Sequence, residues 1–324
     1  MDPAHGHQTI ISSCIAVASI IGIYGNACFV YTSLRYKEAR SKHRVLLSYL
    51  CLMHIIGLVY ECLSAFRMVA NAHMSRSTCF NSLVPYLIVQ QSQYAIYLVI
   101  GLDLVYMIFR PGAYNKMHPI AHISFAIIST CSYGVGIAIA GSIGSDDPEL
   151  LVCNPPLSLP PDVNSIRSFI NLGIAVAVIL MYTIIIVSMV FKRCEKNANE
   201  ASRTKGSIGK YETRIIRSSV ILMCAASISW MPAIIIVRIS FLMDPDMAML
   251  LATYAVIPAA LSYSSTYYVY ILTSKDTRRL LWHVGLCAFL PQLQTGSSAQ
   301  ATSVVRPSSP KRKRTISSRL TTDK

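Results

Sequence analysis

Long apolar stretches alternate with short polar segments along most of the chain. One of them runs for 24 steps from Cys79 to Asp103. At a rise of about 1.5 Å per residue, a helix of this length covers about 36 Å. A membrane hydrocarbon core is about 30 Å thick, so a stretch of this kind can cross it. The pattern predicts seven membrane-spanning helices, at residues 10–34, 45–70, 80–109, 119–143, 166–191, 215–241 and 247–272.

The composition agrees with a membrane protein. The chain has 324 residues, of which 53% are apolar and 14% are charged, whereas soluble proteins are about 25% charged. The first apolar run is too long for a cleaved signal peptide and has no basic residue before it. We therefore expect the first helix to be retained.

The basic residues predict the orientation of the chain. Of the 29 Lys and Arg residues, 25 fall after the first, third, fifth and seventh predicted spans. Basic segments face the cytoplasm, so residues 1–9 are predicted to be extracellular and the C-terminus cytoplasmic. The net charge of +14 does not indicate a nucleic-acid partner, because it belongs to these segments. The basic run at residues 311–314 is better explained by attraction to anionic membrane lipid.

Several polar side chains fall inside the predicted spans, where an unpartnered polar group is costly. His54, Glu61 and Arg67 lie in the second span, and residues 90–93 of the third span are all polar. These side chains could bind neighbouring helices or a ligand, and both interpretations stay open.

The sequence gives little support to other classes of function. An enzyme would need a convergent acid/base or metal-binding set, and the nearest pair, His54 and Glu61, lacks further partners. No catalysis, cofactor or metal is therefore predicted. A membrane transporter or channel is the alternative function, and internal repeats, which many transporters have, do not occur in this sequence.

The third span ends in a short signature that includes Asp103, Ile108, Pro111 and Tyr114. In these positions the chain resembles rhodopsin-like G-protein-coupled receptors. The fuller string at residues 100–104, Ile-Gly-Leu-Asp-Leu, is closer to the nematode serpentine receptors of class sx. One difference stands out. Most rhodopsin-like receptors have an Arg where this chain has Leu104, so the usual pair between that Arg and an acid, here Glu212, cannot form.

Further motifs support the resemblance. Gly25-Asn26 matches the first helix, Trp230-Met231-Pro232 matches the sixth, and His54 stands where the wider family has an acid. A proline in mid-membrane bends its helix. The resemblance implies structural or activation roles for Asn26, His54, Asp103, Leu104, Pro111, Tyr114, Tyr182, Glu212, Trp230, Pro232 and Tyr270.

The cysteines add a further expectation. Most of the ten cysteines fall inside predicted helices or on the cytoplasmic side, and the topology places Cys79 and Cys153 at the extracellular face. The resemblance implies a disulfide bond between them, with two free thiols as the alternative.

The resemblance implies an all-α membrane protein with a seven-helix bundle at residues 10–273. It also implies an amphipathic cytoplasmic helix at 274–290, in which Cys287 is a candidate for lipidation, and a disordered tail at 291–324. The implied function is that of a chemosensory receptor in the plasma membrane, for example in the membrane of sensory cilia. The implied partner is a heterotrimeric G protein. Its ligand, an unidentified small molecule or short peptide, would bind among the pocket candidates Glu61, Arg67, Tyr86, Gln90, Asn171, Trp230, Arg238 and Tyr254. Tyr86 stands where amine receptors have an Asp, so an amine held by that ion pair is not expected.

Overall fold

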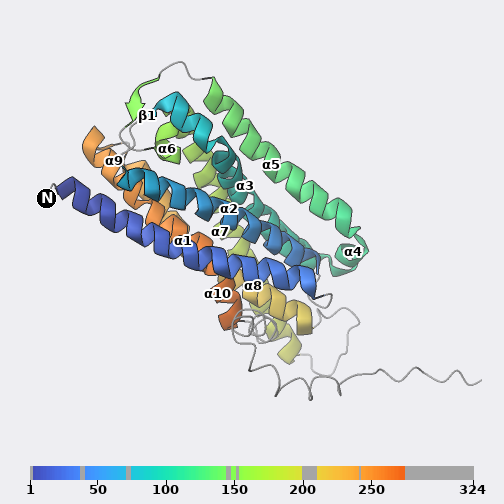
Figure 1. Ribbon diagram of the computed structural model, residues 1–324. Coiled ribbons are helices and arrows are strands. Elements are labelled where there is room, and N and C mark those ends of the chain that lie inside the picture. The colour runs from blue at the N-terminus through green and yellow to red at the C-terminus, as the bar shows by residue number, and fades with distance from the viewer. Residues whose placement is uncertain are drawn as a thin grey trace, which may run out of the picture.

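In a computed structural model the chain forms a bundle of long helices (Figure 1). The structure describes residues 3–36, 41–70, 74–143, 147–150, 153–198, 210–240 and 242–273. The longer helices are α1 (Pro3–Arg35), α2 (Lys42–Val69), α3 (Arg76–Phe109), α5 (Pro119–Ser142), α7 (Pro161–Ala198), α8 (Lys210–Ser240), α9 (Pro245–Tyr254) and α10 (Val256–Thr273). The connections contain the short helices α4 (Pro111–Lys116) and α6 (Pro155–Ser158) and an antiparallel pair of strands, β1 (Met74–Ser75) and β2 (Glu149–Leu150).

Seven crossings of a membrane can be followed through the bundle. Six helices of the described residues are long and apolar enough to span it, namely α1, α2, α3, α5, α7 and α8, and α9 with α10 makes the seventh crossing. The outer surfaces are apolar, with Phe66, Phe125 and Phe191 each more than 70% exposed. Such a surface suits lipid rather than water. The predicted all-α, seven-helix bundle is confirmed.

The seventh crossing differs from the prediction of one helix at residues 247–272. Helix α9 ends at Tyr254, Ala255 forms a turn, and α10 begins at Val256. Pro258 provides a physical reason for the break. It has no N–H to donate to the carbonyl of Tyr254 four residues earlier, and its ring crowds that carbonyl.

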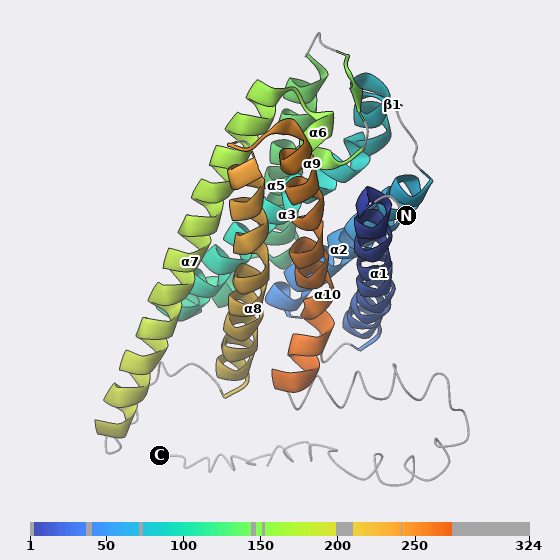
Figure 2. The same ribbon diagram turned by 90° about the vertical axis from the view of Figure 1, so that its left-hand side faces the viewer.

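Other helix ends also differ from the predicted ones. Helix α1 begins at Pro3, so residues 3–9, which were predicted to precede the first span, belong to the first helix. Helix α7 begins at Pro161 and extends to Ala198, beyond the neighbouring ends of α8 and α10 (Figure 2). The predicted cytoplasmic helix at 274–290, with Cys287, and the tail at 291–324 lie outside the described residues.

Local chemistry explains where several helices begin. The Ser41 side chain accepts a hydrogen bond from the amide of Arg44 and caps α2. Ser75 caps α3 in the same way. Prolines stand at the first position of α4 and α5, where the missing N–H would have no partner within the helix.

The bundle has two ends. The start of α1, the start of α3, the β1–β2 pair, α6 and α9 lie at one end (Figure 1). We call this the disulfide end, because Cys79 and Cys153 are bonded there. The start of α2 and the ends of α3 and α10 lie at the other, which we call the Asp103 end.

Close helix contact fixes part of this frame. A Cβ atom added at Gly134 on α5 would lie 2.3 Å from the backbone oxygen of Ile88 on α3. A backbone atom cannot move aside as a side chain can, so only glycine fits between these two helices. The α3–α5 contact therefore depends on this residue.

Candidate functional site

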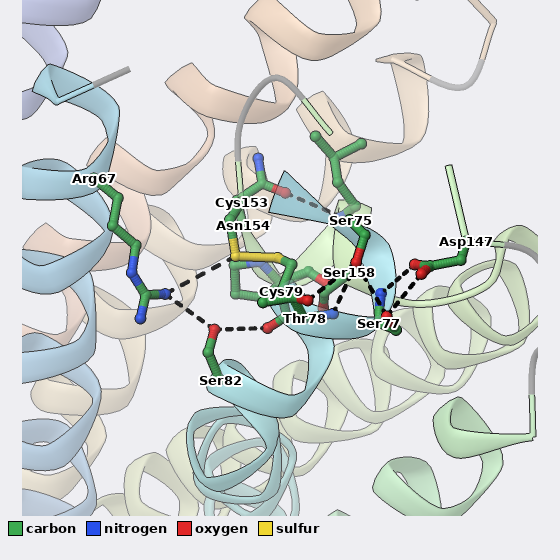
Figure 3. The surroundings of a disulfide bond; sticks show 12 residues. Arg67, Ser75, Ser77, Thr78, Cys79, Ser82, Asp147, Cys153, Asn154 and Ser158 are labelled. Atoms are coloured by element: carbon green, nitrogen blue, oxygen red, sulfur yellow. Dashed lines mark hydrogen bonds between the residues drawn. A yellow bond between two sulfur atoms is a disulfide. The ribbon is translucent and has the colours of Figure 1, made fainter. Parts of the chain in front are cut away.

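At the disulfide end, Cys79 on α3 is bonded to Cys153 in the segment that follows β2 (Figure 3). Their Cα atoms are 5.6 Å apart. The predicted bridge is present, and it ties this segment to the first turn of α3. Both sulfur-bearing residues are buried.

Two side chains flank this bridge. Arg67 on α2 donates a hydrogen bond from Nη1 to Ser82 Oγ at 3.1 Å, and the same nitrogen lies 4.0 Å from Cys153 Sγ. On the other side, the carboxylate of Asp147 accepts from the amide and the hydroxyl of Ser77 at 2.7 and 2.9 Å (Figure 3). These bonds hold the pKa of Asp147 below its ordinary value. Arg67 therefore borders the bridge.

Deeper in the bundle, Glu61 on α2 meets Tyr86 on α3. The Tyr86 hydroxyl donates to Glu61 Oε1, and the two residues are 3% and 0% exposed. The ring of Tyr60 stacks on that of Tyr86 with centroids 5.6 Å apart. Two of the pocket candidates are thus direct neighbours.

A second group of buried polar residues surrounds Arg167 on α7, which is 5% exposed. Its Nη2 donates to Asn164 Oδ1 at 2.7 Å and its Nη1 to Gln90 Oε1 at 3.3 Å. One turn further along α7, Asn171 accepts a hydrogen bond from the Tyr133 hydroxyl of α5 at 2.8 Å. We call these five residues the Arg167 cluster. It joins α3, α5 and α7 and contains two pocket candidates, Gln90 and Asn171.

Trp230 on α8 lies beside this cluster. Its ring contacts Tyr94 with centroids 4.2 Å apart and Tyr97 with centroids 5.8 Å apart, and Tyr94 lies close to Arg167. A narrow crevice that does not admit a water molecule is lined by Tyr97, Val178, Met223, Ala226, Ser227 and Trp230. Pro232 lies inside the same helix two residues on.

The two remaining pocket candidates, Arg238 and Tyr254, contact other parts of the structure. The Arg238 guanidinium on α8 stacks on the ring of Phe169 at 3.6 Å, and Phe169 is 64% exposed on the outer surface. The Tyr254 hydroxyl on α9 lies 2.7 Å from His7 Nδ1 on α1. The structure therefore does not bring these two side chains to Glu61 or Arg167.

His54 lies at the centre of the bundle and is fully buried. Its Nε2 is 3.2 Å from the Tyr97 hydroxyl and its Nδ1 is 3.3 Å from Thr266 Oγ1. The side chain thus joins α2 to α3 and α10.

Asn26 joins α1 to the seventh crossing. Its Nδ2 donates to the backbone oxygen of Tyr263 on α10 at 2.9 Å. Among the described hydrogen bonds, none joins the Asn26 side chain to α2. Packing explains the glycine that precedes Asn26, because a Cβ atom at Gly25 would lie 2.9 Å from Tyr267 Cβ.

At the opposite end, Asp103 on α3 is 2% exposed and is held by three side chains. His43 Nδ1 on α2 lies 2.8 Å from one carboxylate oxygen, and His122 Nε2 on α5 lies 2.8 Å from the other. The Tyr114 hydroxyl on α4 donates to Asp103 at 3.3 Å. The acid of the third-helix signature therefore finds its partners in histidines.

The contacts continue to α8 and α10. His43 Nε2 is 2.7 Å from Ser219 Oγ, and Ser219 Oγ is 2.9 Å from the Tyr270 hydroxyl. An ionised carboxylate only accepts hydrogen bonds, so a neutral His43 donates through Nδ1 and accepts at Nε2. Ser219 then donates to His43 and accepts from Tyr270. We call this hydrogen-bonded set of side chains the Asp103 network; it consists of His122, Asp103, His43, Ser219 and Tyr270.

Other signature residues are placed as follows. Leu104 is fully buried in the apolar core beside Met107 and Ile108. Pro111 begins α4. Tyr182 is buried on α7, with a hydroxyl that has no partner among the described residues. The side chain of Glu212 lies outside the described part of the chain.

Sequence reasoning missed four of these residues. Arg167 entered the sequence analysis only as one of the basic residues on the predicted extracellular side. His43 was missed because it lies just before the predicted second span. His122 and Ser219 carried no signal beyond being polar within apolar helices. Such residues could have been found from the cost of placing a polar side chain in a span, but that cost does not say which helices meet.

Comparisons with known proteins agree with this architecture. The sequence model of the family described as serpentine type 7TM GPCR chemoreceptor Srsx matches residues 19–283. The crystal structure of squid rhodopsin is similar, with a TM-score of 0.68 at 16% sequence identity over 91% of this chain and 91% of that chain, which establishes a shared fold. No curated protein matches the chain. Because the family model covers most of its length, the chain belongs to the Srsx family of serpentine seven-transmembrane GPCR chemoreceptors.

Proposed function

We propose that this chain is a chemosensory receptor of the plasma membrane that binds an extracellular small molecule or short peptide and signals to a heterotrimeric G protein. In this proposal the disulfide end faces outward and the Asp103 end faces the cytoplasm. The distribution of 25 of the 29 basic residues supports this orientation. The Cys79–Cys153 bond supports it as well, because disulfides persist in oxidising, extracellular compartments.

The ligand would bind between the disulfide end and Trp230. Glu61 and Arg167, the buried acid and base among the described residues of this half of the bundle, lie here, and ionisable residues inside a membrane are usually functional. Family membership supports a receptor of external chemicals. The ligand contacts of Glu61, Tyr86, Gln90 and Asn171 stay predictions.

The signal would pass through α8. Trp230 contacts Tyr94 and Tyr97 on α3 and lies two residues before Pro232, where the helix lacks a backbone hydrogen bond and bends more easily. A ligand that binds one bundle arrangement more tightly shifts the population toward it. Pressure on Trp230 would in this way change the position of the lower part of α8.

The single observation that carries this proposal is the Asp103 network. It connects α8, through Ser219, to α2, α3 and α10 with hydrogen bonds of 2.7–2.9 Å. We propose that these bonds act as a latch that keeps the cytoplasmic end closed in the resting receptor. Opening of the latch would let α8 move outward and expose a surface for the G protein.

Nucleotide exchange tests the proposed function. The purified receptor in lipid nanodiscs is mixed with a panel of heterotrimeric G proteins, and uptake of a non-hydrolysable GTP analogue is measured against empty nanodiscs. At least one G protein should take up nucleotide faster with the receptor present. Uptake equal to that with empty nanodiscs across the panel, for the wild type and for a latch-weakened variant such as Ser219→Ala, would contradict the proposal.

A further inference from the structure

Arg167 is unusual among the charged residues of the bundle. Among the described residues, the buried acids and bases other than histidine are Glu61, Asp103 and Arg167. Asp103 has two histidines and Glu61 has Tyr86. Arg167 forms no ion pair with a described residue.

The partners of Arg167 are neutral and do not use all of its donors. A guanidinium group has five N–H donors. The two hydrogen bonds to Asn164 and Gln90 leave Nε buried without a partner among the described residues. A buried positive charge without a counterion is strongly destabilising, so this arrangement costs stability unless an anion joins it.

The surroundings of Arg167 suit a ligand that carries an acid group. Tyr94, Tyr133, Tyr86 and Tyr263 lie close to Arg167, and their rings offer apolar faces to a ligand. A planar guanidinium matches a carboxylate with two parallel hydrogen bonds. Glu61, the buried acid among the described residues of this half of the bundle, already accepts a hydrogen bond from Tyr86.

We propose that Arg167 binds the carboxylate group of the ligand, so that this receptor recognises small organic acids or peptides through an acid group. The proposal rests on the proposed function and specifies its ligand class. It also links the ligand to α8, because Tyr94 lies close to Arg167 and contacts the ring of Trp230. A carboxylate on Arg167 would act on the Tyr94–Trp230 contact and so on the helix that carries the latch.

Thermal unfolding of the purified receptor tests the proposal without a G protein. The probes are acetate, butanoate, benzoate and phenylacetate, each compared with its primary amide, together with inorganic phosphate. At least one carboxylate should raise the melting temperature of the wild type, and its amide should not. In Arg167→Gln the half-saturating concentration of that carboxylate should increase about tenfold or more, because a charge-assisted pair is lost.

Arg76→Gln is the matched control. Arg76 lies at the start of α3 beside the β1–β2 pair, so this substitution removes one charge from the same end of the bundle without touching the Arg167 cluster. It should leave the carboxylate effect unchanged. A carboxylate that stabilises Arg167→Gln as well as the wild type would overturn the proposal. So would equal stabilisation by the amides, stabilisation by phosphate alone, or no stabilisation by any carboxylate.

The control for folding is the melting temperature of Arg167→Gln without any probe. If Arg167 is an unpaired charge awaiting a ligand, its replacement should leave this temperature unchanged or raise it. A marked fall would assign Arg167 a structural role and would overturn the proposal. Because no G protein is present, a negative result here leaves the nucleotide-exchange test of receptor function unaffected.

Discussion

Removal of the Ser219 hydroxyl should release the proposed latch. Ser219 is fully buried and bridges His43 Nε2 and the Tyr270 hydroxyl. Ser219→Ala deletes both hydrogen bonds and leaves two buried polar atoms without this partner. Each bond contributes about 0.5–1.5 kcal/mol net to stability. The free energy that favours the resting arrangement over an open one lacking both bonds should therefore decrease by about 1–3 kcal/mol.

This loss converts into a measurable change in activity. A difference of about 1–3 kcal/mol shifts an equilibrium between two states by about 5- to 150-fold. Ligand-free nucleotide exchange on the G protein should therefore rise by at least about fivefold in Ser219→Ala, if the open state is rare in the wild type. The assay compares purified receptors at equal concentration in the same nanodiscs.

Ser229→Ala is the matched control for this prediction. It makes the same substitution on the same helix, but the Ser229 hydroxyl donates within α8 to the carbonyl of Ala225 at 3.1 Å. Its basal exchange should equal that of the wild type. Equal basal exchange in Ser219→Ala and Ser229→Ala, at equal amounts of folded receptor, would refute the reasoning.

Three further predictions concern the frame of the bundle. Cys79→Ser removes the disulfide, so surface expression measured with an extracellular epitope should fall strongly, whereas an unchanged surface level would argue against a structural role for the bridge. Gly134→Ala places a methyl group against the Ile88 carbonyl, so the melting temperature should fall by several degrees, and Gly136→Ala, which meets open space, should not lower it. Asp147 has its pKa below the ordinary value of 3.8, so its contribution to stability is present above that value and is lost as the pH falls below it. Protonation of Asp147 weakens its hydrogen bonds to Ser77, which lies two residues before Cys79. Reduction of the disulfide by a phosphine should therefore become faster below about pH 4 in the wild type but not in Asp147→Asn. An equal increase of the reduction rate in both proteins would contradict this.

The helices and the bridge were predictable because their causes are local. An apolar stretch of sufficient length must form a helix in lipid, since each backbone N–H and C=O needs a partner within the segment. The Cys79–Cys153 bond followed from the topology and from family resemblance. The break at Ala255 was missed because the apolar pattern continues through Pro258.

The site was only partly predictable because it depends on which helix faces meet. Glu61 and Tyr86 were both candidates, but their mutual contact depends on the rotation of α2 against α3. Leu104 suggested only that a usual ion pair is lost. The structure adds that Asp103 recruits His43 and His122 from α2 and α5, a contact between residues 60 and 19 positions away in sequence that no short motif encodes.

The most direct test of the latch is a distance measurement across the Asp103 end. Spin labels are placed at Lys116, on α4, and Arg217, on α8, both of which are exposed. The remaining reactive cysteines are removed and the disulfide is kept. We expect a single short distance in the free receptor, a longer one when a nucleotide-free G protein is bound, and a mixture of the two in Ser219→Ala without G protein. Identical distance distributions in all three samples would contradict the account.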